Sequence, residues 1–166
     1  MATVLAFPIL GALVILQSAI ASRVTLLQGS ADLVLLAVIA WAIHPKVESA
    51  WQWAVIGGLL VNIPSAMPLG IPLIGYLVTT GLALLLRQRV WQVPVLAMLS
   101  ATFLGSLVCL GLDWAVLRFL GTPLPLGQSF YLVILPATLI NLLLAVPFFA
   151  FAGDLAARLY PAEIEI

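Results

Sequence analysis

Charged residues divide this chain into long apolar stretches. Only six Lys or Arg and six Asp or Glu occur in 166 residues. A charge at the centre of a bilayer costs about 2.5–3.5 kcal/mol on insertion scales, so the uncharged stretches predict membrane-spanning helices. We predict six, over residues 3–22, 31–44, 49–63, 72–86, 90–112 and 130–152.

Proline and glycine set the boundaries that the charges leave open. The uncharged stretch between Glu48 and Arg87 is too long for one span and about right for two. Residues 62–72 contain three prolines and a glycine, which a regular helix does not accommodate, so the third helix ends there. After the fifth helix, residues 113–120 are amphipathic enough to lie along the membrane interface. Residues 121–127 predict a rigid turn.

The composition explains why lipid must be the solvent. Hydrophobic residues make up 64% of the chain, charged residues 7%, and mean hydropathy is +1.27, whereas soluble domains carry about 25% charged residues. We therefore expect one all-α polytopic membrane domain over residues 1–166. Residues 19–21 fit a signal-cleavage spacing, but no Lys or Arg precedes the first stretch, so we expect a retained helix. The net charge of zero gives no reason to expect nucleic-acid binding.

The basic residues and the tryptophans predict the orientation. With the N-terminus inside, four basic residues fall on the inner side and two on the outer side, which favours cytoplasmic termini. The inner four are Lys46, Arg87, Arg89 and Arg158, and the outer two are Arg23 and Arg118. The five tryptophans lie near predicted helix ends, where indoles rest at headgroup level. They are Trp41, Trp51, Trp53, Trp91 and Trp114.

No predicted span carries a charge at its centre, and the sequence shows no catalytic triad, phosphate loop or pair of carboxylates. We therefore expect neither an enzyme nor a bound metal or cofactor. Polar residues within the spans predict interhelical hydrogen bonds. Asp32 predicts a helix N-cap, with contact to a partner or to Arg23 as the alternative. The pair Gly57 and Gly58 predicts close helix packing, and Cys109 a small buried side chain.

Several short motifs occur in a fixed order along the chain. They are Leu-Gln-Ser at 16–18, Ala-Asp-Leu-Val-Leu-Leu at 31–36, Gly-Gly-Leu-Leu-Val-Asn at 57–62, Pro-Leu-Gly-Ile at 68–71 and Leu-Pro-Ala-Thr-Leu-Ile-Asn at 135–141. This order resembles the rod shape-determining protein MreD family. Ala31 replaces that family's usual proline, and Asn62 stands where it commonly has aspartate.

The resemblance implies a six-helix fold similar to the substrate-binding subunits of energy-coupling-factor transporters. It also implies a non-enzymatic scaffold of the cell-elongation machinery in the bacterial inner membrane. The implied partner is the bitopic protein MreC, and through it the penicillin-binding transpeptidase, the RodA glycosyltransferase and the MreB filament. Small-residue stripes facing lipid and residues 113–128 are the expected contact regions. The candidate partner-binding or structural residues are Gln17, Asp32, Gly57, Gly58, Asn62, Pro68, Gly70 and Asn141.

Two other functions are compatible with the sequence. A vitamin or metabolite uptake subunit would need a polar-lined cavity. Gln17, Asn62 and Asn141 are the candidate amide side chains for lining it. A small membrane protein of unrelated function is the third possibility.

Overall fold

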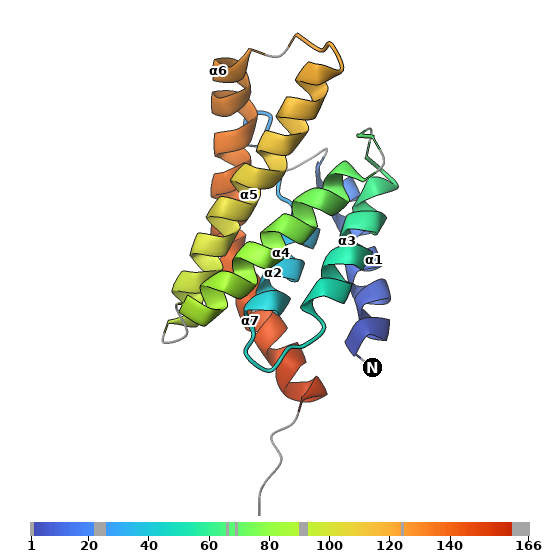
Figure 1. Cartoon of the computed structure of the whole chain (residues 1–166), viewed down its shortest axis with the longest axis vertical. Helices are drawn as coiled ribbons and strands as arrows, with labels where there is room; N and C mark the ends of the chain where they lie inside the picture. The colour runs from blue at the N-terminus through green and yellow to red at the C-terminus, as the bar shows by residue number, and fades with distance from the viewer. Residues whose placement is uncertain are drawn as a thin grey trace, which may run out of the picture.

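The computed structural model describes residues 2–21, 26–65, 67–68, 70–89, 93–123 and 125–160. They form helices without a β-strand (Figure 1). The elements are α1 (Ala2–Ala21), α2 (Leu33–Ile43), α3 (Ala50–Asn62), α4 (Ile71–Arg89), α5 (Pro94–Phe119), α6 (Leu126–Ser129), the π-helical η1 (Phe130–Ile134) and α7 (Leu135–Leu159). The last three continue directly into one another, and we call them the C-terminal rod.

Four of these helical stretches are long and apolar enough to cross a membrane: α1, α4, α5 and the C-terminal rod. At 1.5 Å per residue, the 20 residues of α1 extend about 30 Å, the thickness of the hydrocarbon core. The predicted all-helical fold is thereby confirmed, and the four apolar helices are consistent with a multi-pass membrane protein. Each predicted stretch contains a helix, but α2 has 11 residues and α3 has 13, which is short for a crossing.

Helix α2 forms the centre of the molecule. All eleven of its residues are buried, and it packs against α1, α3, α4, α5 and α7. Figure 1 shows it, in cyan, in the middle of the bundle. A helix that is apolar on every side is stable only when other helices or lipid surround it. Here the neighbouring helices do so.

The predicted end of the fifth helix at residue 112, with a separate segment over residues 113–120, is wrong. Helix α5 continues through them to Phe119. No proline occurs between Pro94 and Phe119, so nothing forces the helix to end earlier. The chain turns only at Gly121, whose φ of +88° suits a residue without a Cβ.

The C-terminal rod starts before the predicted residue 130 and ends after the predicted 152. Its π-helical turn follows from Pro136, which has no N–H to donate to the carbonyl of Leu132. The N–H of Gln28 donates to that carbonyl instead, at 3.0 Å. The 26–29 turn comes so close to the rod that a Cβ on Gly29 would lie 2.5 Å from the backbone nitrogen of Ala137.

Two of the tryptophans lie inside the bundle instead of facing the surrounding lipid headgroups. Trp41 and Trp53 are buried and stacked, with ring centroids 4.4 Å apart. Their indole N–H groups donate to Ser49 Oγ at 3.1 Å and to the carbonyl of Ala2 at 3.2 Å. Because these internal partners replace water, both rings fit the core. Trp91 lies outside the described residues.

The beginning of α1 and the end of α7 lie at the same end of the bundle. Ala2 bonds to Trp53, Trp53 stacks on Trp41, and Trp41 lies 6.4 Å from the ring of Tyr160. We call this the terminal end, and the end where α2 begins the opposite end.

Candidate functional site

Five helices each contribute one polar side chain to a cluster at the start of α2. They are Gln17 of α1, Asp32 at the N-cap of α2, Tyr76 of α4, Ser106 of α5 and Asn141 of α7. We call this group the polar cluster. Sequence analysis singled out Gln17, Asp32 and Asn141, and the structure brings these three together. It gave no sign of Tyr76, because a lone tyrosine in an apolar helix has no distinguishing pattern.

The first purpose of the polar cluster is to satisfy the amide groups that begin α2. The N–H of Leu35 donates to Asp32 Oδ1 at 2.9 Å, as the predicted N-cap requires. Gln17 Oε1 accepts from the N–H of Val34 at 3.3 Å, and Asn141 Oδ1 accepts from the N–H of Asp32 at 2.9 Å. The first amides of a helix have no partner within it, and hydrocarbon offers none. Side chains of α1 and α7 therefore complete the helix end.

The remaining contacts link α2 to α4 and join α5 to α7. Tyr76 donates its hydroxyl proton to Asp32 Oδ1 at 2.7 Å, and Asn141 Nδ2 donates to Ser106 Oγ at 2.9 Å. Ser106 lies at the midpoint of α5 and Asn141 near the midpoint of the rod. The Asp32 carboxyl group thus lies level with the middle of two spanning helices. Looking for charges at the centres of spans missed it, because Asp32 stands at the start of the predicted span over residues 31–44.

A small, partly enclosed cavity of about 60 Å³ adjoins the polar cluster between α4 and α5. Asp32, Tyr76, Cys109, Asp113 and Ser65 contribute its polar lining. Ligand pockets commonly hold about 300–1,000 Å³, so this space suits one or two water molecules. In the part of the chain that the structure describes, no three His, Cys, Asp or Glu side chains are grouped to hold a metal ion.

The other end of α2 is completed by a single side chain. Arg87 Nη1 donates to the carbonyls of Ala42 at 3.2 Å, His44 at 2.8 Å and Val47 at 3.1 Å. A cation at a helix C-terminus also complements the helix dipole. Sequence analysis treated Arg87 only as a loop charge. Nothing in the local sequence indicates that it reaches back to carbonyls forty or more positions earlier.

The glycine pair lies where α3 meets α2 and α4. A Cβ on Gly57 would lie 3.1 Å from Val38 Cγ2, which belongs to a side chain. A Cβ on Gly58 would lie 2.7 Å from Leu73 Cα, which belongs to the backbone of α4. The structure therefore places both glycines at close helix contacts, and Gly58 at the less adaptable one.

Three candidates lie away from the polar cluster, around the connection from α3 to α4. The side-chain oxygen of Asn62 is buried without a hydrogen-bond partner. The carbonyl of Pro68 accepts from the N–H of Ile71 at 3.3 Å, and Gly70 has a φ of +98°. These two residues shape the start of α4. Leu69, between them, lies outside the described residues.

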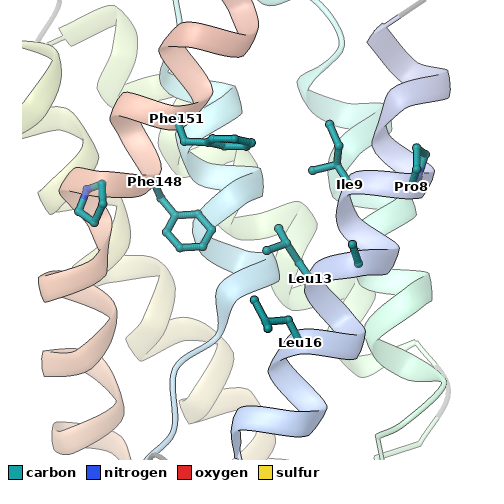
Figure 2. Close-up of a pocket in the computed structure, with 8 residues that line it drawn as sticks. Pro8, Ile9, Leu13, Leu16, Phe148 and Phe151 are labelled. Atoms are coloured by element: carbon teal, nitrogen blue, oxygen red, sulfur yellow. The ribbon is translucent and has the colours of Figure 1, made fainter.

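An apolar groove of about 690 Å³ separates α1 from α7. Figure 2 shows Leu13 and Leu16 of α1 projecting toward Phe148 and Phe151 of α7, with α2 behind them. A proline lies in each wall, within α1 and within α7. The lining is Pro8, Ile9, Ala12, Leu13, Leu16, Pro147, Phe148 and Phe151, and we call it the α1–α7 groove.

The polar cluster and the α1–α7 groove differ in chemistry. The polar cluster is internal, and its described hydrogen bonds join parts of the same chain. The groove is apolar and leaves the facing sides of two spanning helices uncovered. Comparisons with protein-family models, with curated proteins and with solved structures give no match to this chain.

Proposed function

We propose that this chain is a non-enzymatic membrane scaffold that binds the transmembrane helix of a single-span partner in the α1–α7 groove. Following the resemblance to the MreD family, the partner is an MreC-like protein, and the setting is the bacterial cell-elongation machinery. The transpeptidase, the RodA-type glycosyltransferase and the MreB filament then associate through that partner.

The α1–α7 groove is the observation that carries this proposal. Its lining extends from Pro8 to Leu16, which is about 12 Å along α1 or roughly two helical turns. Helices associate in a membrane through close van der Waals packing. An apolar groove between two helices, with small or flat residues such as Ala12 and the two prolines in its walls, supports such packing.

The fold in the proposal is the six-crossing arrangement of energy-coupling-factor substrate-binding subunits. Helix α2 with the preceding residues 26–32 forms one crossing, and α3 forms another. The terminal end carries Arg87, which bonds to the 42–47 segment, and Arg158, near the end of α7. The predominance of basic residues in the corresponding loops supports a cytoplasmic location for this end, and with it for both termini.

The alternative of a vitamin uptake subunit receives less support. Gln17 and Asn141, two of its three amide candidates, make hydrogen bonds to the start of α2. The adjoining cavity of about 60 Å³ is too small for a vitamin. A thermal-shift screen of the purified protein against a vitamin panel separates the two functions, because a specific stabilisation favours uptake.

The scaffold proposal is tested by filling the groove. Ala12→Trp places an indole in the groove from an exposed position on α1. We expect this variant to capture at least about tenfold less MreC-like partner from co-expressing membranes, equivalent to about 1.4 kcal/mol.

Ile15→Trp is the matched control, because Ile15 is 73% exposed on the same helix and does not line the groove. It should capture the partner like the wild type. Equal capture by the Ala12 and Ile15 variants would contradict groove binding, while thermal unfolding of both verifies that they are folded.

A further inference from the structure

The α5–α6 connection projects past the other helices at the opposite end. Contacts between the antiparallel helices place Gly75 of α4 beside Cys109 of α5 and Thr79 of α4 beside Gly105 of α5, further along toward the terminal end. Ile71, the first residue of α4, is four residues before Gly75, and Asp113 is four residues after Cys109. Because the two helices run antiparallel, Ile71 and Asp113 lie at the same level. Residues 114–119 of α5 therefore lie beyond α4, by about 9 Å at 1.5 Å per residue.

The C-terminal rod projects with α5. The hydrogen bond between Asn141 and Ser106 sets their register, which places η1 and α6 beside the last residues of α5. Figure 1 shows this pair of helices extending past the neighbouring ends of α1, α3 and α4. We call residues 114–123 and 125–134 the hairpin tip.

The residues of the hairpin tip suit neither bulk water nor hydrocarbon. Arg118 is the only charged residue within the tip, and it stacks over Trp114 with 5.8 Å between the guanidinium carbon and the ring centroid. Phe119 is 92% exposed and Tyr131 67% exposed, and Leu120 and Leu126 are also exposed. Aromatic residues and arginine with this exposure are typical of the membrane interface.

The projection of about 9 Å is slightly longer than one headgroup layer is thick. A bilayer has a hydrocarbon core of about 30 Å and a total thickness of about 40–45 Å, which leaves about 5–7 Å of headgroup region on each side. Helix α5, with 26 residues, extends about 39 Å. A helix that begins at the hydrocarbon boundary near Pro94 reaches the opposite boundary near Asp113, so the next turns lie at headgroup level.

We propose that the hairpin tip is a lipid-binding anchor that lies in the phospholipid headgroup layer, with Phe119, Leu120 and Leu126 inserted among the lipids. This contact fixes the height and tilt of α5 and α7. Both helices contribute a side chain to the polar cluster, and α7 also forms one wall of the groove. The inference rests on helix register and surface chemistry and is independent of the scaffold function.

The test measures the depth of a fluorescent label in lipid vesicles that contain no other protein. Phe119→Cys is made in a Cys109→Ala background and labelled with nitrobenzoxadiazole. Leu143→Cys, at a position 78% exposed in the middle of the rod, is the deep control, and Glu48→Cys, in an exposed loop, is the aqueous control. The quenchers are aqueous iodide and phosphatidylcholine carrying a spin label at the headgroup, near the top of an acyl chain or near its end.

We expect spin labels at the headgroup and upper chain to quench the Phe119 label most strongly, with iodide quenching at least threefold weaker than at Glu48. Iodide quenching equal to that at Glu48, without quenching by lipid, would place the hairpin tip in water, where a soluble protein could bind it. Strongest quenching from the chain end, as expected for Leu143, would place it in hydrocarbon. Either result overturns the proposal.

Discussion

Asn141 uses both ends of its side-chain amide to join helices. Its oxygen accepts from the backbone of Asp32 and its nitrogen donates to Ser106. Leucine provides neither group, and aspartate cannot donate when it is ionised. In a membrane an unpaired amide has no water to bond to, so the two contacts depend on asparagine at this position.

Asn141→Ala is expected to lower the free energy of unfolding by about 1–3 kcal/mol, because it leaves the N–H of Asp32 and the hydroxyl of Ser106 without their partner. Unfolding in mixed detergent micelles measures the change. Leu143→Ala, on the lipid-facing side of the same helix, should change stability by less than about 0.5 kcal/mol. Equal effects at the two positions would contradict the bridging role.

At Gly58 the backbones of α3 and α4 approach closely, and a substitution there tests this contact. Gly58→Ala is expected to destabilise the fold by about 1–3 kcal/mol, because the new Cβ meets the backbone of Leu73, which cannot rotate away. Gly57→Ala should have a smaller effect, since Val38 can adjust its side chain. The same micelle unfolding assay measures both.

Gly11→Ala is the matched control for the glycine pair. It also lies within a helix, but a Cβ there would have nothing within 4 Å. It should be neutral or stabilising by up to about 1 kcal/mol, the helix-propensity difference between the two residues. If Gly58→Ala were as well tolerated as Gly11→Ala, α3 and α4 would be further apart than the structure has them.

At the scale of elements, α2 is a short helix that depends on its neighbours at both ends. The polar cluster bonds to its first amides, and Arg87 bonds to its last carbonyls and to the loop that follows. An 11-residue helix has little stability in isolation. Its position in the centre of the molecule is therefore a property of the whole bundle.

Arg87→Gln is expected to lower stability by about 1.5–3 kcal/mol, the range for hydrogen bonds to charged groups. It should also speed amide hydrogen exchange around His44 and Val47, whose carbonyls lose their donor. Arg89→Gln, at an exposed position on the same helix, should leave both quantities near the wild-type values. Unchanged exchange in the Arg87 variant would show that the loop does not depend on this contact.

The order of the helices could be predicted from the sequence because it depends on local signals. Charges and prolines mark most boundaries, and Asp32 was correctly predicted as the N-cap of α2. The length of α5 was underestimated, since Asp113 was taken as an end signal. A charge near the boundary is tolerated within a helix when, as here, a small polar-lined cavity adjoins it.

The contacts between elements could not be predicted in the same way. Tyr76, Ser106 and Arg87 look ordinary within their own helices, and their roles depend on atoms distant in sequence. Trp41 and Trp53 were placed at headgroup level, but internal partners for their indole N–H groups make burial favourable. Hydropathy along a chain indicates which segments enter the membrane, but it contains no information about which helix faces pack against each other.

At the scale of the whole molecule, the polar and apolar surfaces are arranged unlike those of a soluble protein. Polar side chains gather inside, around the start of α2, and large apolar side chains remain exposed along α1, α5 and α7. Lipid solvates the outer surface, while the internal hydrogen bonds position the helices relative to one another. The α1–α7 groove is part of that outer surface, so lipid or a partner helix can occupy it without disturbing the polar cluster.

The arrangement of the two ends gives a prediction for the topology. Ala2 and Tyr160 lie near the same tryptophan pair, so an even number of crossings must separate them. In a Cys109→Ala background, Glu48→Cys and Arg158→Cys should react with a membrane-impermeant maleimide from one side of oriented vesicles. Leu27→Cys and Thr122→Cys should react only from the other side. The decisive comparison is between Leu27 and Glu48, which flank α2. Labelling of both from the same side would mean that the chain does not cross there, and the proposed six-crossing arrangement would then be wrong.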